Sequence, residues 1–233
     1  MKKVGIIIFI LAVVTGVVLA NVVSFGRLTG KLVNFKVDFG RVAGSGNVVT
    51  QKRDVSDFTT VEVKGAFDVE IVAQKDFGVE IEGDDNLLEF IRTDVGSGVL
   101  EISSEKSFST NGRIKVRVSA PNIEDLDLSG ASNVSLSGLA NDSMKVHSSG
   151  ASKIKLAGET REFEIKLSGA SKVEATDLKS VNVRVDSSGA SHAKVFVTGD
   201  LNVDLSGASK VTYFGNPQNI SKDLSGASSV NPN

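Results

Sequence analysis

From residue 58 onward, hydrophobic and polar residues alternate along the chain. The segments FTTVEVKG, FDVEIVA, FGVEIEG, GVLEISS and RIKVRVSA all lie between residues 58 and 120 and have a period of two. This period is typical of β-strands with one buried face. Residues 84–95 differ, because Leu87, Leu88 and Ile91 stand at helical spacing behind an Asp/Asn start, which predicts one short helix or turn.

The tetrapeptide SGAS occurs six times, starting at residues 129, 149, 168, 188, 206 and 225. Successive copies are separated by 20, 19, 20, 18 and 19 residues. Such regular spacing predicts one structural unit stacked on copies of itself.

Aligning the copies on their first serine brings apolar residues into register on both sides of the tetrapeptide. Three positions before it stand Leu126, Val146, Ile165, Val185, Val203 and, in the last copy, Lys222; five positions after it stand Val134, Ile154, Val173, Ala193, Val211 and Val230. The pattern predicts an all-β fold, a parallel β-helix (β-solenoid) with about 19 residues per coil. Six similar antiparallel hairpins are the alternative, since alternation does not give the direction of pairing.

The glycine of each copy is predicted to form a structural corner of the solenoid. Glycine permits the sharp bend, and the serine hydroxyls can satisfy backbone groups that are left unpaired there. We expect one straight file of corners at Gly130, Gly150, Gly169, Gly189, Gly207 and Gly226. Residues 61–71 superimpose on residues 165–175, so the solenoid is expected to begin well before Pro121.

The N-terminus predicts export. Lys2 and Lys3 precede a long apolar run over residues 4–23, which predicts a hydrophobic helix acting as a signal peptide cleaved after Ala20 or as an uncleaved membrane anchor. Residues 24–41 are interpreted as a linker, and residues 42–233 as the solenoid, less regular over 42–120 and regular over 121–233. The expected location is the bacterial cell envelope, in the periplasm or at the cell surface.

Composition removes several classes of function. The chain has no Cys, two His and a formal net charge of -2, which excludes cysteine chemistry and three-His metal sites and does not favour a nucleic-acid partner. The absence of Trp and the single Tyr argue against an aromatic-lined sugar site.

The repeat register also predicts two charged columns. Two positions before each SGAS stand Asp127, His147, Lys166, Asp186, Asp204 and Asp223; four positions after the first serine stand Asn133, Lys153, Lys172, His192, Lys210 and Ser229. Asp186, Asp204 and Asp223 fall on successive rungs, where like charges repel. One interpretation is a solvated face compensated by lysines; the other is a ligand- or ion-binding ridge of Asp127, Asp186, Asp204 and Asp223, with a weak Ca²⁺ site at the last three. No other cofactor is expected.

The last coil ends with the chain, and a bare strand edge invites pairing. We therefore expect residues 220–230 to be capped by a local deviation or by another chain, including a second copy of this one.

Three stretches resemble the head GIN domain family of "putative auto-transporter adhesins": residues 44–72, 79–95 and 126–136. The resemblance covers roughly residues 42–230 and implies a β-helical exported domain, with no catalytic residues to carry over. Together with the pattern, it leads us to expect a non-enzymatic solenoid that presents a rigid surface to an envelope or extracellular glycan or protein. The alternatives are a carbohydrate-active enzyme resembling a polysaccharide lyase, with Lys166, Asp186 and Asp204 as its site, and an envelope structural or regulatory domain.

Overall fold

The computed structural model describes residues 41–110 and 112–233. The predicted N-terminal helix at residues 1–23, and all of the predicted linker except Arg41, lie outside the described residues. No helix within the described ranges is both long and apolar enough to cross a membrane.

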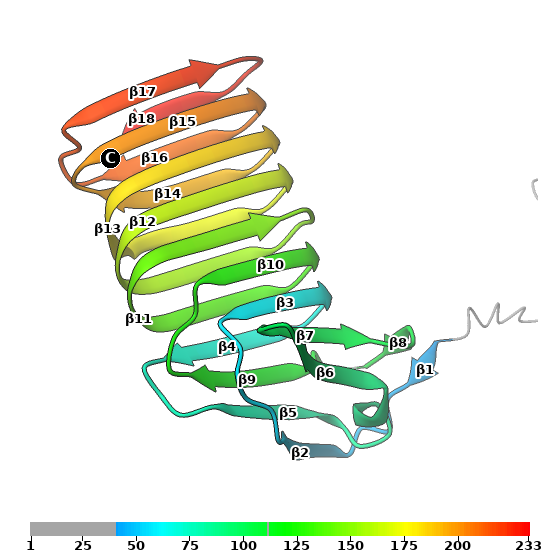
Figure 1. Ribbon diagram of the computed structural model, residues 1–233. Helices are drawn as coiled ribbons and strands as arrows, with labels where there is room; N and C mark the ends of the chain where they lie inside the picture. Colours follow the sequence, from blue (N-terminus) through cyan, green and yellow to red (C-terminus); the bar gives the residue numbers. More distant parts are fainter. Residues whose placement is uncertain (1–40, 111) are drawn as a thin grey trace, which may run out of the picture. The chain divides into compact units, whose positions relative to one another are not determined.

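The described part of the chain is built almost entirely of β-strands (Figure 1). The strands before the first SGAS corner are β1 (Val42–Ala43), β2 (Val48–Arg53), β3 (Thr60–Gly65), β4 (Asp68–Ala73), β5 (Gly78–Asp84), β6 (Ile91–Gly96), β7 (Val99–Ser104), β8 (Phe108–Ser109), β9 (Lys115–Ala120) and β10 (Asp125–Gly130). Those that follow are β11 (Asn133–Ser148), β12 (Lys153–Gly169), β13 (Lys172–Gly189), β14 (His192–Val197), β15 (Asp200–Gly207), β16 (Lys210–Phe214), β17 (Asn219–Leu224) and β18 (Ser229–Pro232).

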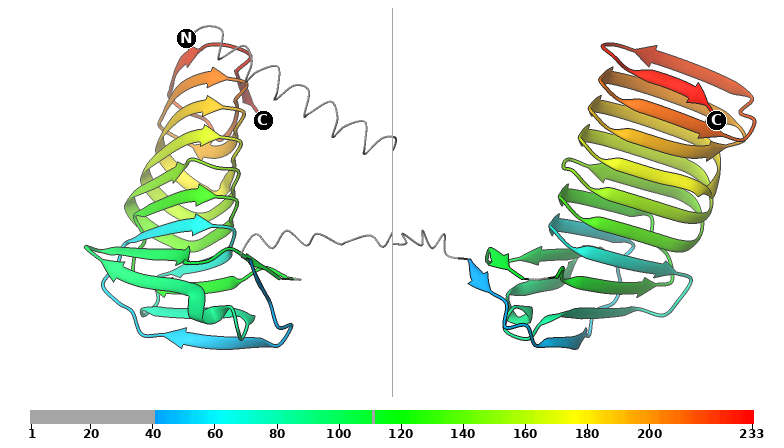
Figure 2. Two further views of the ribbon diagram at one scale, coloured as in Figure 1. Left: turned by 90° about the vertical axis from the view of Figure 1, so that its right-hand side faces the viewer. Right: turned by 180° about the vertical axis from the view of Figure 1, so that it is seen from behind.

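The chain winds as a parallel β-solenoid with two long faces, seen from further sides in Figure 2. Face A is the stack of β3, β10, residues 145–148 of β11, 162–169 of β12, 182–189 of β13, β15 and β17. Face B is the stack of β9, β4, residues 133–137 of β11, 153–157 of β12, 172–175 of β13, β14, β16 and β18. Each strand within a face runs parallel to its neighbours, so the solenoid prediction is confirmed and the hairpin alternative is wrong.

The SGAS corners form a single file that joins the two faces. A Cβ atom built on Gly189 would lie 2.3 Å from the carbonyl oxygen of Gly169, and one built on Gly169 would lie 2.3 Å from that of Gly150. Equivalent contacts join Gly130 to Gly150 and Gly189 to Gly207. Because a side chain at these positions would strike the backbone of the coil beneath, the corner needs glycine, and the SGAS glycines lie over one another from coil to coil.

The two serines of each SGAS corner have different environments. The hydroxyl of Ser191 donates a hydrogen bond to the carbonyl oxygen of Gly169 at 3.2 Å and accepts one from the backbone N–H of Ser171 at 3.2 Å. Ser191 is buried, whereas Ser188, the first serine of the same corner, is exposed. The buried hydroxyls therefore satisfy backbone groups at the bend, as the sequence predicts for this residue type.

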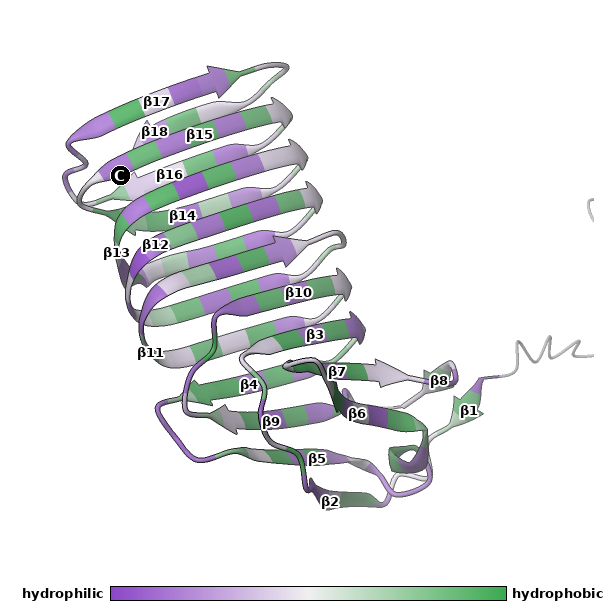
Figure 3. Cartoon of the chain, in the orientation of Figure 1, coloured by the Kyte–Doolittle hydropathy of each residue, from purple (hydrophilic) through white to green (hydrophobic). Residues whose placement is uncertain are grey.

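The core is a set of apolar columns that run along the solenoid. Purple and green alternate along the strands in Figure 3, as expected when successive side chains point to opposite sides of a strand. On face A, the column that begins at Leu126 and ends at Val203 is at most 4% exposed. Like residues stack because each strand pairs in register with the equivalent strand of the next coil.

The first coil begins well before Pro121, as predicted. Gly65 pairs with Gly130 between β3 and β10, and Val69 pairs with Val134 between β4 and β11. Beneath this coil the pairing is mixed: β2, β5 and β9 pair antiparallel, as do β6 and β7. The predicted helix or turn at residues 84–95 is a 3₁₀ helix of three residues, Leu88–Phe90, and then β6.

The C-terminal end carries a local deviation from the repeat. Within the described residues, β17 pairs only with β15 and β18 only with β16. Lys222 occupies the otherwise apolar inward column of face A, and its Nζ donates a hydrogen bond to the carbonyl oxygen of Val230 at 3.5 Å. Inward-pointing charges are one way in which proteins protect a strand edge, and Lys222 is such a deviation. A cap from a second chain stays a prediction.

Candidate functional site

A hollow of about 390 Å³ follows face A beside the corners, and we call it the corner groove. Its charged lining comes from the column two positions before each SGAS, and hydroxyls from successive corners complete it. The charged residues are Asp127, His147, Lys166, Asp186 and Asp204, the corner serines are Ser149, Ser168, Ser188 and Ser206, and Ser148 and Ser187 precede two of these corners. The groove therefore offers carboxylates, ammonium and imidazole groups, and hydroxyls along one line of the surface.

The register places each residue of this column on its own rung. Asp186 pairs with Asp204, and Asp204 pairs with Asp223, so the three predicted aspartates do lie on successive rungs. Asp127, Asp186 and Asp204 all line the corner groove, but Asp223 is not part of the lining. The structure thus brings together three of the four predicted ligand-binding residues. Their role in binding stays a prediction.

Neighbouring cations compensate part of the charge in the groove. Arg184 donates two hydrogen bonds to Asp186, from Nε to Oδ2 at 3.0 Å and from Nη2 to Oδ1 at 3.1 Å. Asp204 forms no ion pair with any residue within the described ranges. The repulsion expected between the stacked aspartates is therefore relieved at Asp186, and Asp204 keeps a carboxylate that is available to a ligand.

An ion pair with Glu164 favours the protonated form of Lys166. The hydrogen bond from Lys166 to Glu164 raises the pKa of the ammonium group and lowers the pKa of the carboxyl group. A lysine that stays protonated can orient or neutralise an acidic group but does not act as a general base. Lys166, Asp186 and Asp204 lie on consecutive rungs, as the lyase alternative requires, yet Lys166 is better suited to binding than to abstracting a proton.

Two buried polar atoms lie close to the N-terminal end of the groove. Asp125 Oδ1 and His147 Nε2 are both shielded from solvent, and neither has a hydrogen-bond partner among the residues that the structure describes. Burial is also the main cause of a raised pKa for Asp125. Buried polar atoms normally have partners, so these two atoms add hydrogen-bonding capacity beside the groove that the chain does not use itself.

No metal centre is evident in the part of the chain that the structure describes, since no group of three or more His, Cys, Asp or Glu side chains there could hold an ion. The Ca²⁺ site at Asp186, Asp204 and Asp223 has no further support in the geometry and stays a prediction.

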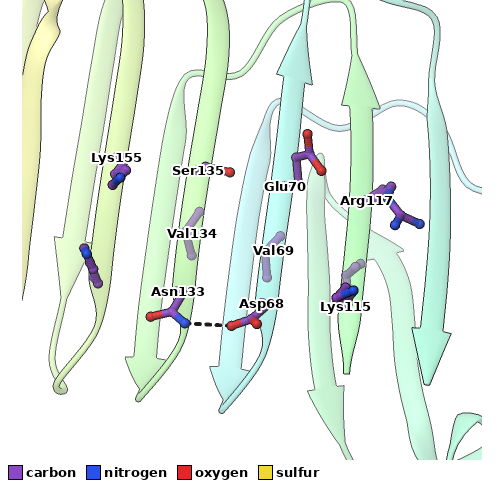
Figure 4. Close-up of a pocket in the computed structure, with 11 residues that line it drawn as sticks. Asp68, Val69, Glu70, Lys115, Arg117, Asn133, Val134, Ser135 and Lys155 are labelled. Carbon is purple, nitrogen blue, oxygen red and sulfur yellow. Dashed lines mark hydrogen bonds between the residues drawn. The ribbon is translucent and has the colours of Figure 1, made fainter. Parts of the chain in front are cut away.

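A second hollow, of about 280 Å³, lies on face B and is shown in Figure 4. Asn133 donates a hydrogen bond from Nδ2 to Asp68 Oδ1 at 2.7 Å within it. Lys115 and Arg117 line the same hollow and pair with Glu82, and the Lys153 and Lys155 side chains also line it. Sequence reasoning placed Asn133 and Lys153 in a column but missed the hollow. The sequence does contain a signal for this hollow. The match of residues 61–71 to residues 165–175 identifies an earlier coil, in which Asp68 occupies the same column as Asn133.

Comparisons with known proteins agree with this architecture. A family model described as "Putative auto-transporter adhesin, head GIN domain" matches residues 57–217. Among solved structures, a "putative adhesin" from Bacteroides fragilis is similar to the chain at 16% identity and a TM-score of 0.66, covering 82% of this chain and 98% of that one. A "putative adhesin" from Parabacteroides merdae has 16% identity and a TM-score of 0.54, covering 83% and 99%.

At these identities the likeness to solved structures shows the fold alone. A "putative lipid binding protein" from Parabacteroides distasonis has 18% identity and a TM-score of 0.47, covering 83% of this chain and 99% of that one. No protein among the curated sequences matches the chain. The family model spans more than half of the chain, and with the solenoid it confirms the resemblance seen in the sequence: the chain belongs to the head GIN domain family.

Proposed function

We propose that the protein is an exported, non-enzymatic solenoid that binds a glycan of the cell envelope or its surroundings through the corner groove. The observation that carries this proposal is the gathering of Asp127, Asp186 and Asp204, with successive corner serines, along one hollow of face A. Carboxylates and hydroxyls accept and donate the hydrogen bonds that sugar hydroxyl groups need. The family description as an adhesin is consistent with a surface that binds rather than transforms its ligand.

Rigidity supports the same proposal. The groove is built on strands that pair in register with the coils on either side, and the carboxylate of Asp186 is held by Arg184. Sites on regular elements position their groups more accurately than sites on loops, and a preorganised surface loses less entropy on binding.

The direct test is a glycan array probed with the full chain in a mild detergent. Asp204→Asn is the informative variant, because Asp204 lines the groove and forms no ion pair within the described residues. We expect it to weaken binding to the selected glycan by about tenfold, the usual effect of losing one hydrogen bond to a charged group. Asp223→Asn is the matched control, since it makes the same change one rung away, outside the groove lining, and should bind as the unmodified chain does.

Two results would contradict the proposal. One is an array on which no glycan is retained; the other is an equal loss of binding in both variants. Release of unsaturated products from a uronate-containing polysaccharide would favour the lyase alternative instead, and its loss in Lys166→Gln would assign that activity to the groove.

A further inference from the structure

The outward side chains of face B carry an excess of positive charge over four consecutive coils. We call Lys153, Lys155, Lys172, Lys194 and Lys210 the basic strip. They project from β12, β13, β14 and β16, in the two outward columns of this face. The same columns on these four strands contain one carboxylate, Glu174.

Ion pairing leaves most of this charge uncompensated. Glu174 contacts Lys172 at 2.6 Å and Lys155 at 4.0 Å. Lys153, Lys194 and Lys210 form no ion pair with any residue of the described ranges. Since the whole chain has a formal charge of -2, the strip is a local concentration of positive charge and not a reflection of a basic protein.

The shape of the strip favours a linear partner. Lys153, Lys172 and Lys210 belong to one column, with His192 between the last two, so the charges follow the solenoid axis at about 4.8 Å per coil. The strip begins at β12. Below it, the same two columns hold Asn133 and Ser135 on β11 and then the carboxylates Asp68 and Glu70 on β4.

The strip lacks the features of a membrane-binding surface. Surfaces that enter a membrane interface combine cations with exposed large apolar side chains. The large apolar residues that are exposed in the described part of the chain are Val48, Val49, Val181, Ile220 and Leu224. None of them lies in the two columns of the strip.

We propose that the basic strip binds a linear polyanionic polysaccharide, whose carboxylate or sulfate groups lie along the solenoid axis against successive lysines. This surface is separate from the corner groove, which lies on face A. The two sites can therefore succeed or fail independently, and together they would let one solenoid hold two different polymers.

The test measures the affinity of the full chain, in a nonionic detergent, for sodium polygalacturonate. The strip variant combines Lys153→Gln, Lys172→Gln and Lys210→Gln, and we expect it to weaken binding by about tenfold at low salt. Raising the salt from about 0.05 M to about 0.2 M should weaken binding by the unmodified chain as well, because exposed charges are screened. Neutral dextran should not bind to the strip, and monomeric galacturonate should compete poorly, since a polymer engages several lysines at once.

A control variant distinguishes the contribution of the strip lysines to the affinity from the effect of lowering the net charge of the protein. Lys52→Gln, Lys145→Gln and Lys179→Gln remove the same charge from exposed positions outside the strip and should leave the affinity unchanged. Equal loss in the control, full affinity in the strip variant, or binding that is insensitive to salt would each overturn the proposal. Binding to mixed micelles of anionic phospholipid in place of polygalacturonate would overturn it in favour of a lipid surface. Asp204→Asn should keep its affinity for polygalacturonate, so a failure of the corner groove does not affect this result.

Discussion

At the scale of single residues, the absence of a side chain at the corner sets how closely two coils approach. Gly207 has a φ of +85°, and a Cβ built there would lie 2.5 Å from the carbonyl oxygen of Gly189. Ala208 donates its backbone N–H to that same oxygen at 2.7 Å. A methyl group on Gly207 would therefore push the two coils apart and weaken the hydrogen bond from Ala208 to Gly189.

Replacing Gly207 with alanine should lower the free energy of unfolding by about 3 kcal/mol, from an unfavourable φ and a backbone clash together. Gly46→Ala is the matched control, because Gly46 has a similar φ of +81° but no atom of residues 41–110 or 112–233 lies within 4 Å of the added Cβ. The control should lose only about 1 kcal/mol. Denaturant unfolding of both variants measures the difference, and equal losses would show that contact between coils contributes nothing.

Asp125 should make the protein less stable as the pH rises. Most carboxyl groups of folded proteins have the opposite effect, because their pKa is lowered on folding. Burial is the main cause that raises its pKa, partly offset by His147 and Lys145. The folded state therefore binds a proton more tightly than the unfolded chain, and stability falls as the pH rises through the interval above the ordinary value of about 3.9. Asp125→Asn should remove this cost and raise the unfolding midpoint at neutral pH.

Glu82→Gln is a control that should change the stability at neutral pH in the opposite direction. Hydrogen bonds from Arg117 and Lys115 lower the pKa of Glu82, so its contribution to stability is present at neutral pH and is lost as the pH falls through its folded-state pKa. This variant should be less stable than the unmodified chain at pH 7. Thermal melts between pH 3 and pH 8 compare the two, and shifts of the same sign at neutral pH would contradict the assignment.

Residue positions in the columns could be predicted from the sequence, but residue environments only in part. The alignment placed Asp186, Asp204 and Asp223 on successive rungs because the pairing in a solenoid follows the repeat. The alignment did not predict that Asp223 lies outside the groove lining, because the end of the groove depends on the side chains that surround the column. Nor did it distinguish buried Ser191 from exposed Ser188, because both belong to one tetrapeptide.

At the scale of elements, β17 shows how the repeat is altered where the solenoid ends. All six of its residues are exposed, and among them Ile220 and Leu224 are 40% and 41% exposed. Lys222 stands between these two in the inward column, where the coils beneath have valine or isoleucine. Without the lysine, the edge would present an uninterrupted apolar row together with unpaired backbone groups.

Lys222→Val should therefore increase self-association of the chain. Light scattering after size-exclusion chromatography, over a series of concentrations, measures the change relative to the unmodified chain. Ser221→Val is the control, because Ser221 is the adjacent residue in the same strand and its side chain points to the outer side of face A. Association that rises equally in both variants would assign the effect to added hydrophobicity and not to the inward column.

Elements within the repeat could be predicted well, and those before it poorly. Constant spacing fixed the direction of pairing for β10 to β18, which alternation alone does not do. Residues 84–95 have apolar residues at helical spacing, yet only Leu88–Phe90 are helical and β6 follows, because Ile91–Gly96 pair with β7. The antiparallel pairs of β5 with β2 and β9 have no repeat to reveal them.

At the scale of the whole solenoid, stability should vary along the axis. A repeat protein gains stability from each unit and from its contacts with neighbouring units, so a coil with neighbours on both sides opens less readily than one at an end. β12 and β13 pair on both sides over long stretches, whereas β17 and β18 each have one partner within the described residues. Opening should begin at the C-terminal coil.

Hydrogen exchange followed by mass spectrometry should therefore find the slowest amides in β12 and β13 and the fastest strand amides in β17 and β18. Gly207→Ala should extend fast exchange to β15 and β16, which adjoin the altered corner, and leave β3 and β4 protected, because coupling passes from one coil to the next. Uniform exchange over all coils, or equal deprotection of β3, would mean that the solenoid opens as a single cooperative unit. The C-terminal coil would then open no more readily than the other coils. Lys222 would affect association between chains without affecting the stability of the last coil.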